Sequence, residues 1–226
     1  MTTIIEASIV LFALGIFSFF SYKRNWLNNE GILIANIIGL STFILGGGNA
    51  LTTLFVFFGV GEAATYFIKG KKKQHHQRNT GNILGNSLAS IVALLLSSTI
   101  GFFGAISASL ADTLSSEIGV LSKKKPRMIT TLKTVQTGVD GGVSALGFLA
   151  AIIGALIVSG MGFLFGLSWE HAVLIFLAGL FGGIIDSVFG ATIQQKKWVD
   201  NNEVNFLGSS AGALFAVLLG IIFGLL

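Results

Sequence analysis

The amino-acid sequence predicts an all-α protein, a polytopic membrane bundle of about eight transmembrane helices. Apolar residues make up 53% of the 226 residues and charged residues only 11%, whereas a typical soluble domain carries roughly 25% charged residues. The mean hydropathy is +0.83. The apolar residues gather in long runs between short polar segments, which is the pattern of helices that cross a bilayer. These observations exclude an ordinary soluble domain, a disordered chain and a nucleic-acid-binding module.

Eight stretches of the chain are candidates for membrane spans, because each approaches the length of about 20 apolar residues that a bilayer requires. The second and fourth are short. In chain order they are about Thr2–Ser21, Gly31–Leu45, Leu51–Ile68, Ile83–Leu96, Thr99–Leu121, Gly142–Gly166, Ala172–Gln195 and Val204–Leu226. The 30 glycines suit close contact between helices in lipid. The absence of cysteine excludes disulfides, thiolate catalysis and cysteine-ligated metals. We expect one integral membrane domain over residues 1–226.

The positions of the 14 Lys and Arg residues predict the orientation of these spans. With eight spans, every one of these residues follows an odd-numbered helix, so all of them lie on one side. The positive-inside rule places these basic loops in the cytoplasm and both termini outside. We therefore expect a multi-pass protein of the cell (inner) membrane, whose longest loops, about Lys69–Asn82 and Ser122–Gly141, face the cytoplasm.

Ionisable side chains within the predicted spans are candidates for function, because they are costly in a membrane. Asp112 shares a helix face with Ser115 and Ser116, which follow it by three and four residues. Glu117 lies well round the helix from Asp112. The two carboxylates would therefore serve one site only if the helix broke between them.

Asp112 and Asp186 lie at matched depth in the fifth and seventh spans. Each precedes the cytoplasmic end of its span by nine residues, or about 13 Å at 1.5 Å per residue. Two such aspartates can hold Mg²⁺, which takes one or two carboxylates and completes its shell with water and phosphate oxygens. The alternative is that each is a hydrogen-bonding partner between helices. For Glu62, in the third span, snorkelling or helix pairing explains the residue at least as well.

A basic loop leads into a glycine-rich segment, Thr137–Gly142, at the start of the sixth predicted helix. Glycines at a helix N-terminus let backbone amides approach an anion. Arg127 and Lys133, earlier in the loop, supply counter-charge for phosphate. The segment lacks the Gly-Lys-Ser/Thr ending of a Walker A motif. A plain basic loop followed by a glycine-rich helix start explains it equally well.

Asparagines occur at the start of two predicted helices. Asn201 and Asn205 are four residues apart at the entry to the last helix, and Asn82 and Asn86 have the same spacing in the fourth. Pairs at this spacing share a helix face. Asn and Asp before an apolar run are also typical helix caps, and capping is the better explanation at Asp200–Asn205.

All of these polar clusters lie on the predicted cytoplasmic side. A transporter usually needs a site near the middle of the membrane that is reached from both faces. A one-sided site suits a reaction between a soluble cytoplasmic molecule and one dissolved in the lipid. Carboxylates, basic residues and glycine amides fit phosphoryl or nucleotidyl transfer, which depends on positioning and charge neutralisation.

Six motifs in register carry a resemblance to a known family. They are Gln77-Arg78-Asn79; Ala111-Asp112-Thr113 with Ser116-Glu117-Ile118-Gly119; Pro126-Arg127-Met128-Ile129-Thr130-Thr131; Gly141-Gly142-Val143-Ser144; Ile185-Asp186-Ser187 with Gly190-Ala191-Thr192; and Asp200-Asn201-Asn202 with Val204-Asn205. The chain thereby resembles the transmembrane protein 19 family, which includes the phytyl-phosphate kinases of plants and cyanobacteria. It is more distantly similar to the CTP-dependent phytol and dolichol kinases. Asp140 stands where many relatives have Asn, and Leu114 where many have Trp.

The resemblance implies a membrane kinase that converts an isoprenyl monophosphate, such as phytyl or geranylgeranyl phosphate, to the diphosphate, with CTP or another nucleoside triphosphate as donor. It implies that Asp112 and Asp186 hold Mg²⁺ and that Glu117 is a further catalytic carboxylate. The substrate- and nucleotide-binding residues that it implies are Arg78, Asn79, Ser115, Ser116, Arg127, Lys133, Thr137, Gly141, Gly142, Ser187, Asn201, Asn202 and Asn205. Among these, Arg78, Arg127 and Lys133 would neutralise the triphosphate, and Gly141 and Gly142 would present backbone amides.

Two other classes of function remain open at this point. The same polar cluster would bind the head group in a transporter or scramblase of polyprenyl phosphates, which would consume no nucleotide. A non-catalytic membrane assembly factor would use the aspartates for stability or partner binding. The expected partners are the isoprenyl monophosphate and membrane lipids, with no nucleic acid, and the prenyl chain length and oligomeric state are left open.

Overall fold

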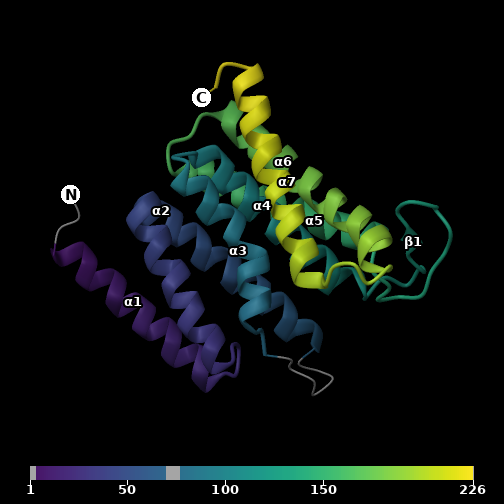
Figure 1. Ribbon diagram of the computed structural model, residues 1–226, viewed down its shortest axis with the longest axis horizontal. Coiled ribbons are helices and arrows are strands. Elements are labelled where there is room, and N and C mark those ends of the chain that lie inside the picture. The colour runs from purple at the N-terminus through teal and green to yellow at the C-terminus, as the bar shows by residue number, and fades with distance from the viewer. Residues whose placement is uncertain (1–3, 70–76, 226) are drawn as a thin grey trace.

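The computed structural model describes residues 4–69 and 77–225, which form a helical bundle with one short antiparallel sheet (Figure 1). In chain order the elements are α1 (Ile4–Lys23), α2 (Asn29–Lys69), α3 (Thr80–Leu95), α4 (Thr99–Gly119), β1 (Arg127–Met128), β2 (Gly142–Val143), α5 (Ala145–Leu164), α6 (Trp169–Phe189), the π-helical turn η2 (Gly190–Gln194) and α7 (Asn201–Ile222). The all-α membrane bundle is confirmed as the fold class, with a sheet of only two residues per strand.

Helix α2 contains both the second and the third predicted spans, because the chain turns back within it. Gly47 has φ 73° and ψ −170°, which is not helical and which glycine adopts without steric cost. A Cβ atom on Gly39 would lie 3.7 Å from Cδ1 of Leu51, although twelve residues of straight helix would separate them by about 18 Å. We refer to residues 29–46 and 48–69 as the first and second arms of α2.

Helix α4 lies at the centre of the bundle. Every residue from Ile100 to Ala111 is buried, and α4 packs against α2, α3, α5, α6 and α7. Small residues permit this close packing: a Cβ atom on Gly104 would lie 2.8 Å from the Gly212 carbonyl oxygen, and one on Gly154 would lie 2.8 Å from that of Leu110. Because protein surrounds α4, it tolerates polar residues that a lipid-facing helix would not.

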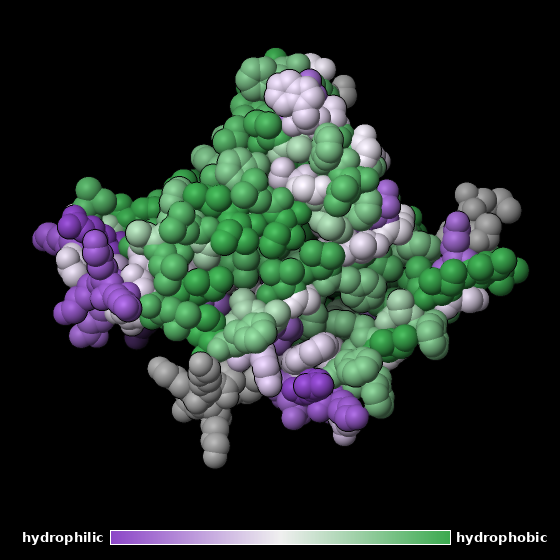
Figure 2. All heavy atoms as spheres, turned by 180° about the vertical axis from the view of Figure 1, so that it is seen from behind, coloured by the Kyte–Doolittle hydropathy of each residue, from purple (hydrophilic) through white to green (hydrophobic). Residues whose placement is uncertain are grey.

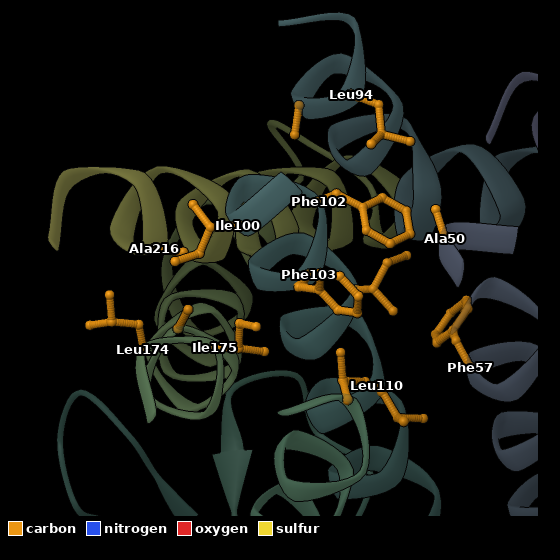
Figure 3. Close-up of a cluster of buried hydrophobic side chains, with 14 of the residues drawn as sticks. Ala50, Phe57, Leu94, Ile100, Phe102, Phe103, Leu110, Leu174, Ile175 and Ala216 are labelled. Carbon is orange, nitrogen blue, oxygen red and sulfur yellow. The ribbon is translucent and has the colours of Figure 1, made fainter. Parts of the chain in front are cut away.

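The largest group of buried apolar side chains surrounds α4 (Figure 3). Phe102, Phe103 and Leu110 project from α4 toward side chains of the neighbouring helices, among them Phe57 of α2 and Ile175 of α6. The rings of Phe102 and Phe103 meet edge to face at 5.3 Å, a favoured aromatic geometry. This core fixes the helices that carry the polar residues of interest.

The outside of the bundle is broadly apolar, and hydrophilic side chains gather at its edges (Figure 2). Exposed Leu, Ile and Phe side chains occur along α1, α5 and α7, as expected of helices in contact with lipid. Five helical stretches of the described residues are long and apolar enough to cross a membrane: α1, residues 29–68 of α2, α5, α6 with η2, and α7. These features are those of a multi-pass membrane protein; the number of crossings and the side of the termini stay predictions.

The loops that the sequence assigns to the cytoplasm lie at one end of the bundle. The backbone amides of Asn28 and Arg78 join two of them, donating to the carbonyls of Arg78 and Trp26. The side chain of Gln195 donates to the Asp140 carbonyl at 3.1 Å and joins two others. In Figure 1 the first turn of α1 and the last turn of α7 both lie at the opposite end. Lys71, Lys72 and Lys73 lie outside the described residues.

Two predicted helix starts were wrong. The sixth predicted helix begins at Ala145 rather than Gly142, because Gly142 pairs with Met128 in the sheet and Ser144 caps the helix by accepting from the Gly147 amide. The last begins at Asn201 rather than Val204. Asp200 is its cap, and the Asp200 and Glu203 side chains accept from each other's backbone amides, which forms a capping box.

Candidate functional site

A polar cavity of about 480 Å³ opens at the end of the bundle where the basic loops meet. It is lined from the second arm of α2, α3, α4, the segment 120–144, α6 with η2, and α7. The predicted site residues that line it are Arg78, Asp112, Ser115, Ser116, Glu117, Thr137, Gly141, Gly142, Asp186, Ser187, Asn201 and Asn205. All six sequence motifs contribute at least one lining residue, although they span residues 77–205.

Asp112 of α4 and Asp186 of α6 face each other in this cavity. Their carboxyl groups lie within hydrogen-bonding reach, and the Ser116 side chain also reaches Asp112. Glycine allows α7 to approach behind the pair, because a Cβ atom on Gly208 would lie only 2.9 Å from Cβ of Asp186. The matched depth expected from the sequence thus corresponds to direct contact between the two side chains.

The aspartate pair fits a bound cation. Two ionised carboxylates in contact repel each other unless a proton or a cation lies between them. Oδ2 of Asp186 is buried and has no hydrogen-bond partner among the described residues. The described residues contain no group of three or more acidic or histidine side chains that could enclose a metal. Water and phosphate oxygens would therefore complete the shell of Mg²⁺ here, as they usually do.

Glu117 lines the same cavity as Asp112, and α4 is helical without interruption to Gly119. The prediction that one site would need a broken helix was therefore wrong. The segment 137–144 lines the cavity together with Asp112 and Glu117. Asp140 in that segment also lines the cavity, and its carboxylate interacts electrostatically with Asp186.

The glycine-rich segment is held against η2. Gly141 has φ 75°, and a Cβ atom on it would lie 2.4 to 2.6 Å from Cβ, N and Cα of Ala191. The Gly141 carbonyl accepts from the Ile129 amide at 2.9 Å. The Gly142 amide donates to the Val139 carbonyl at 3.0 Å. This turn occupies the Gly142 amide, so the expectation that it would be presented to an anion was wrong.

Among the described residues that line the cavity, Arg78 is the single basic one. Its Nε lies 2.7 Å from Oε1 of Glu62, whose side chain is only 4% exposed, and its guanidinium lies over the Phe58 ring at 5.6 Å. Glu62 therefore pairs helix α2 with the loop before α3, which is the helix-pairing alternative. Arg127 and Lys133 are exposed and do not belong to the lining.

The asparagines divide into structural and cavity-lining groups. Asn79 caps α3 in a capping box with Asn82, and it does not line the cavity. Asn202 accepts from the Asn82 side chain at 2.8 Å and joins α7 to α3. Asn201 and Asn205 line the cavity one turn apart, so the Asp200–Asn205 segment provides both a cap and two lining amides.

Several lining residues lay outside the predicted set: Thr65, Gln77, Asn82, Asn86, Asp140 and Gln194 among them. The shared helix face of Asn82 and Asn86 was a usable signal. Nothing local distinguishes Thr65 or Gln194, because only the packing of α2 and η2 brings them to the cavity.

Replacing Glu62 with Gln should lower the stability of the protein by about 3 kcal/mol, because it leaves the Arg78 guanidinium without its buried counter-charge. Thermal unfolding in detergent would measure the loss. Glu30→Gln, an exposed carboxylate in the first turn of the same helix, is the matched control and should change little. The double variant Glu62→Gln/Arg78→Gln should recover part of the loss. If Glu62→Gln and Glu30→Gln lower the stability by the same small amount, the ion pair between Glu62 and Arg78 does not stabilise the protein.

The sequence is similar to known membrane proteins. The family described as "Integral membrane protein DUF92" matches residues 12–213. An uncharacterized membrane protein of Methanocaldococcus jannaschii is 31% identical over 97% of this chain and 96% of its own length. "Protein PGR" of Arabidopsis thaliana is 32% identical over 78% of this chain and 75% of its own. "Protein VTE6, chloroplastic" of the same plant is 28% identical, and the match covers 85% of this chain but only 65% of VTE6. No solved structure matches.

Proposed function

The chain belongs to the DUF92 family of integral membrane proteins, and we propose from this membership and from the cavity that it is a membrane phosphotransferase. Its reaction is the conversion of an isoprenyl monophosphate to the diphosphate, with a nucleoside triphosphate, CTP first, as donor. The family resemblance of the six motifs suggests this reaction. The observation that carries the proposal is that all six motifs meet at one polar cavity around the Asp112–Asp186 pair.

The charges of the cavity favour a nucleotide that enters with a divalent cation. Among the described residues, four carboxylates line it, from Asp112, Glu117, Asp140 and Asp186, against the one guanidinium of Arg78. A bare triphosphate would be repelled by this lining. Asp112 and Asp186 are the residues that would hold Mg²⁺. Bound there, Mg²⁺ would neutralise the phosphate oxygens and draw electron density from the transferring group.

The other polar side chains of the cavity would position the substrates. Ser115, Ser116 and Ser187 offer hydroxyl donors to phosphate oxygens. The amides of Asn201 and Asn205 lie one turn apart on α7 at the same cavity, and they would orient the nucleotide or the acceptor. Arg127 and Lys133, on the exposed segment beside the cavity, would attract the anionic nucleotide without contacting the reacting atoms.

The proposed transfer needs no separate general base. An oxygen of the acceptor phosphate, already ionised near neutral pH, attacks the terminal phosphorus of the nucleotide. The new P–O bond gives the isoprenyl diphosphate. The bond from that phosphorus to the bridging oxygen breaks, and the nucleoside diphosphate leaves with the electron pair. Catalysis of this kind depends on alignment and on charge neutralisation, which the cavity residues provide.

The test is an assay of the purified protein in nanodiscs with Mg²⁺ and geranylgeranyl or phytyl monophosphate. CTP, ATP, UTP and GTP are supplied separately, and mass spectrometry follows the products. The expected result is isoprenyl diphosphate and nucleoside diphosphate in equal amounts, and none after chelation of Mg²⁺. If the protein binds the monophosphate but consumes none of the four nucleotides, the proposed kinase activity is wrong. Movement of the monophosphate across vesicles that contain the protein would then identify a transporter.

A further inference from the structure

A second, apolar crevice lies among α1, both arms of α2 and α3. It is narrow, at about 50 Å³ against about 480 Å³ for the polar cavity. Its apolar lining is Leu14 and Phe17 of α1, Ala35, Ile38 and Gly39 of the first arm, Leu51, Leu54, Phe55, Phe57 and Phe58 of the second arm, and Ile83 of α3. These elements lie on the side of the bundle away from β1 (Figure 1).

The crevice and the polar cavity share three residues, Arg78, Asn82 and Asn86. The rest of the crevice lining is apolar apart from Ser87. Positive charge and amide groups therefore stand where the two spaces meet. One molecule with an anionic head and a hydrocarbon tail would match this change of polarity, its head in the cavity and its tail among the phenyl rings.

We infer that this crevice holds the isoprenyl tail of the acceptor, with the phosphate placed beside Arg78, Asn82 and Asn86. The inference rests on the proposed function for the chemistry of the acceptor. The location follows from the three residues that the two spaces share and from the apolar lining. Burial of a hydrocarbon chain here would supply binding energy that does not depend on the nucleotide.

Close packing around Gly39 marks the far end of the crevice. Along the second arm the lining runs from Phe58, beside Arg78, to Leu51, which is about 10 Å at 1.5 Å per residue. Gly39 lies opposite Leu51. A Cβ atom on Gly39 would lie 2.8 Å from Cδ2 of Leu14 and 3.7 Å from Cδ1 of Leu51. A larger residue at position 39 would therefore shorten the space available to the tail.

Photolabelling of the wild-type protein locates the tail directly. The probe is a geranylgeranyl monophosphate analogue with a diazirine on its terminal isoprene unit, used in nanodiscs without nucleotide. Labelled peptides should map to α1 and the two arms of α2, around Leu14, Gly39 and Leu51. Excess geranylgeranyl monophosphate should suppress the label, and inorganic phosphate should not. Labels on α5, α6 or α7 would overturn the inference.

Chain-length preference gives the second test. Gly39→Val should raise KM for geranylgeranyl monophosphate about tenfold and leave kcat unchanged, while KM for geranyl monophosphate changes less than twofold. The matched control is Gly59→Val on the second arm, because a Cβ atom there would meet nothing within 4 Å and Gly59 does not line the crevice. Gly59→Val should leave KM unchanged for both substrates. Equal effects of Gly39→Val on both chain lengths would overturn the inference.

The two proposals fail in different ways. If the label lies in the crevice but no donor gives diphosphate, the proposed kinase activity is wrong and the proposed tail site stands. If diphosphate forms but the label lies elsewhere and Gly39→Val has no effect that depends on chain length, the proposed kinase activity stands and the proposed tail site is wrong. If Gly39→Val does not fold, the label on the wild-type protein still decides the inference.

Discussion

Asparagine in place of Asp112 or of Asp186 should reduce diphosphate formation by at least about 100-fold. Removing one preorganised group that stabilises developing charge costs roughly 10²–10³ in rate, and here it would also weaken the metal site. The two carboxyl groups are in contact, and Oδ2 of Asp186 has no hydrogen-bond partner among the described residues. Initial rates with saturating nucleotide and acceptor would measure the loss.

Unfolding measurements separate a lost metal site from a lost fold. Mg²⁺ should raise the Tm of the wild-type protein, because a cation that binds only the folded state stabilises it. This rise should disappear in both asparagine variants. Without Mg²⁺ the variants should be at least as stable as the wild type, because one of two repelling charges is removed.

Asp200→Asn is the matched control for the same substitution. Asp200 caps α7 at the same end of the bundle, does not line the cavity, and can be replaced as a cap by Asn. It should retain activity and the response to Mg²⁺. Asparagine variants at positions 112 and 186 with wild-type rates and an unchanged Mg²⁺ response would disprove the catalytic pair and favour hydrogen bonding between helices.

Gly141→Ala should lower the activity at least about 100-fold. Of the glycine-to-alanine substitutions in the loop, it should be the most disruptive. Two costs combine. The φ of 75° is unfavourable for alanine by about 1–2 kcal/mol. The added Cβ would also overlap the backbone of Ala191 in η2, and backbone atoms of a packed helix cannot move aside as a side-chain end can. The segment 137–144 would have to leave η2, which opens the cavity.

Gly138→Ala carries the first cost without the second. Gly138 also has a positive φ, 89°, but a Cβ atom on it would meet nothing within 4 Å. It should lose only the conformational term of about 1–2 kcal/mol and keep most of its activity. Thermal unfolding and kcat/KM should be measured for both variants. Similar losses in the two would show that contact between Gly141 and η2 is not needed to close the cavity.

The fold class and many of the polar residues that line the cavity could be predicted from the sequence alone. Long apolar runs and low charge specify membrane helices, because a bilayer excludes unpaired polar groups whatever the packing. The placement of all basic residues after alternate spans predicted that those loops share one end. The six motifs already contained Asp112, Asp186 and Arg78. All three line one cavity, as do the side chains of Asn201 and Asn205.

Only the tertiary structure decided which of these groups meet. Helical spacing assigns residues to faces but does not say which faces pack together. The contact between Asp112 and Asp186 and the pairing of Glu62 with Arg78 both arise from close approaches between segments distant in sequence. The turn from Val139 to Gly142 occupied the Gly142 amide, and Arg127 and Lys133 are exposed outside the cavity lining. These outcomes depend on the small residues that allow one backbone to touch another, and such contacts leave no local pattern in the sequence.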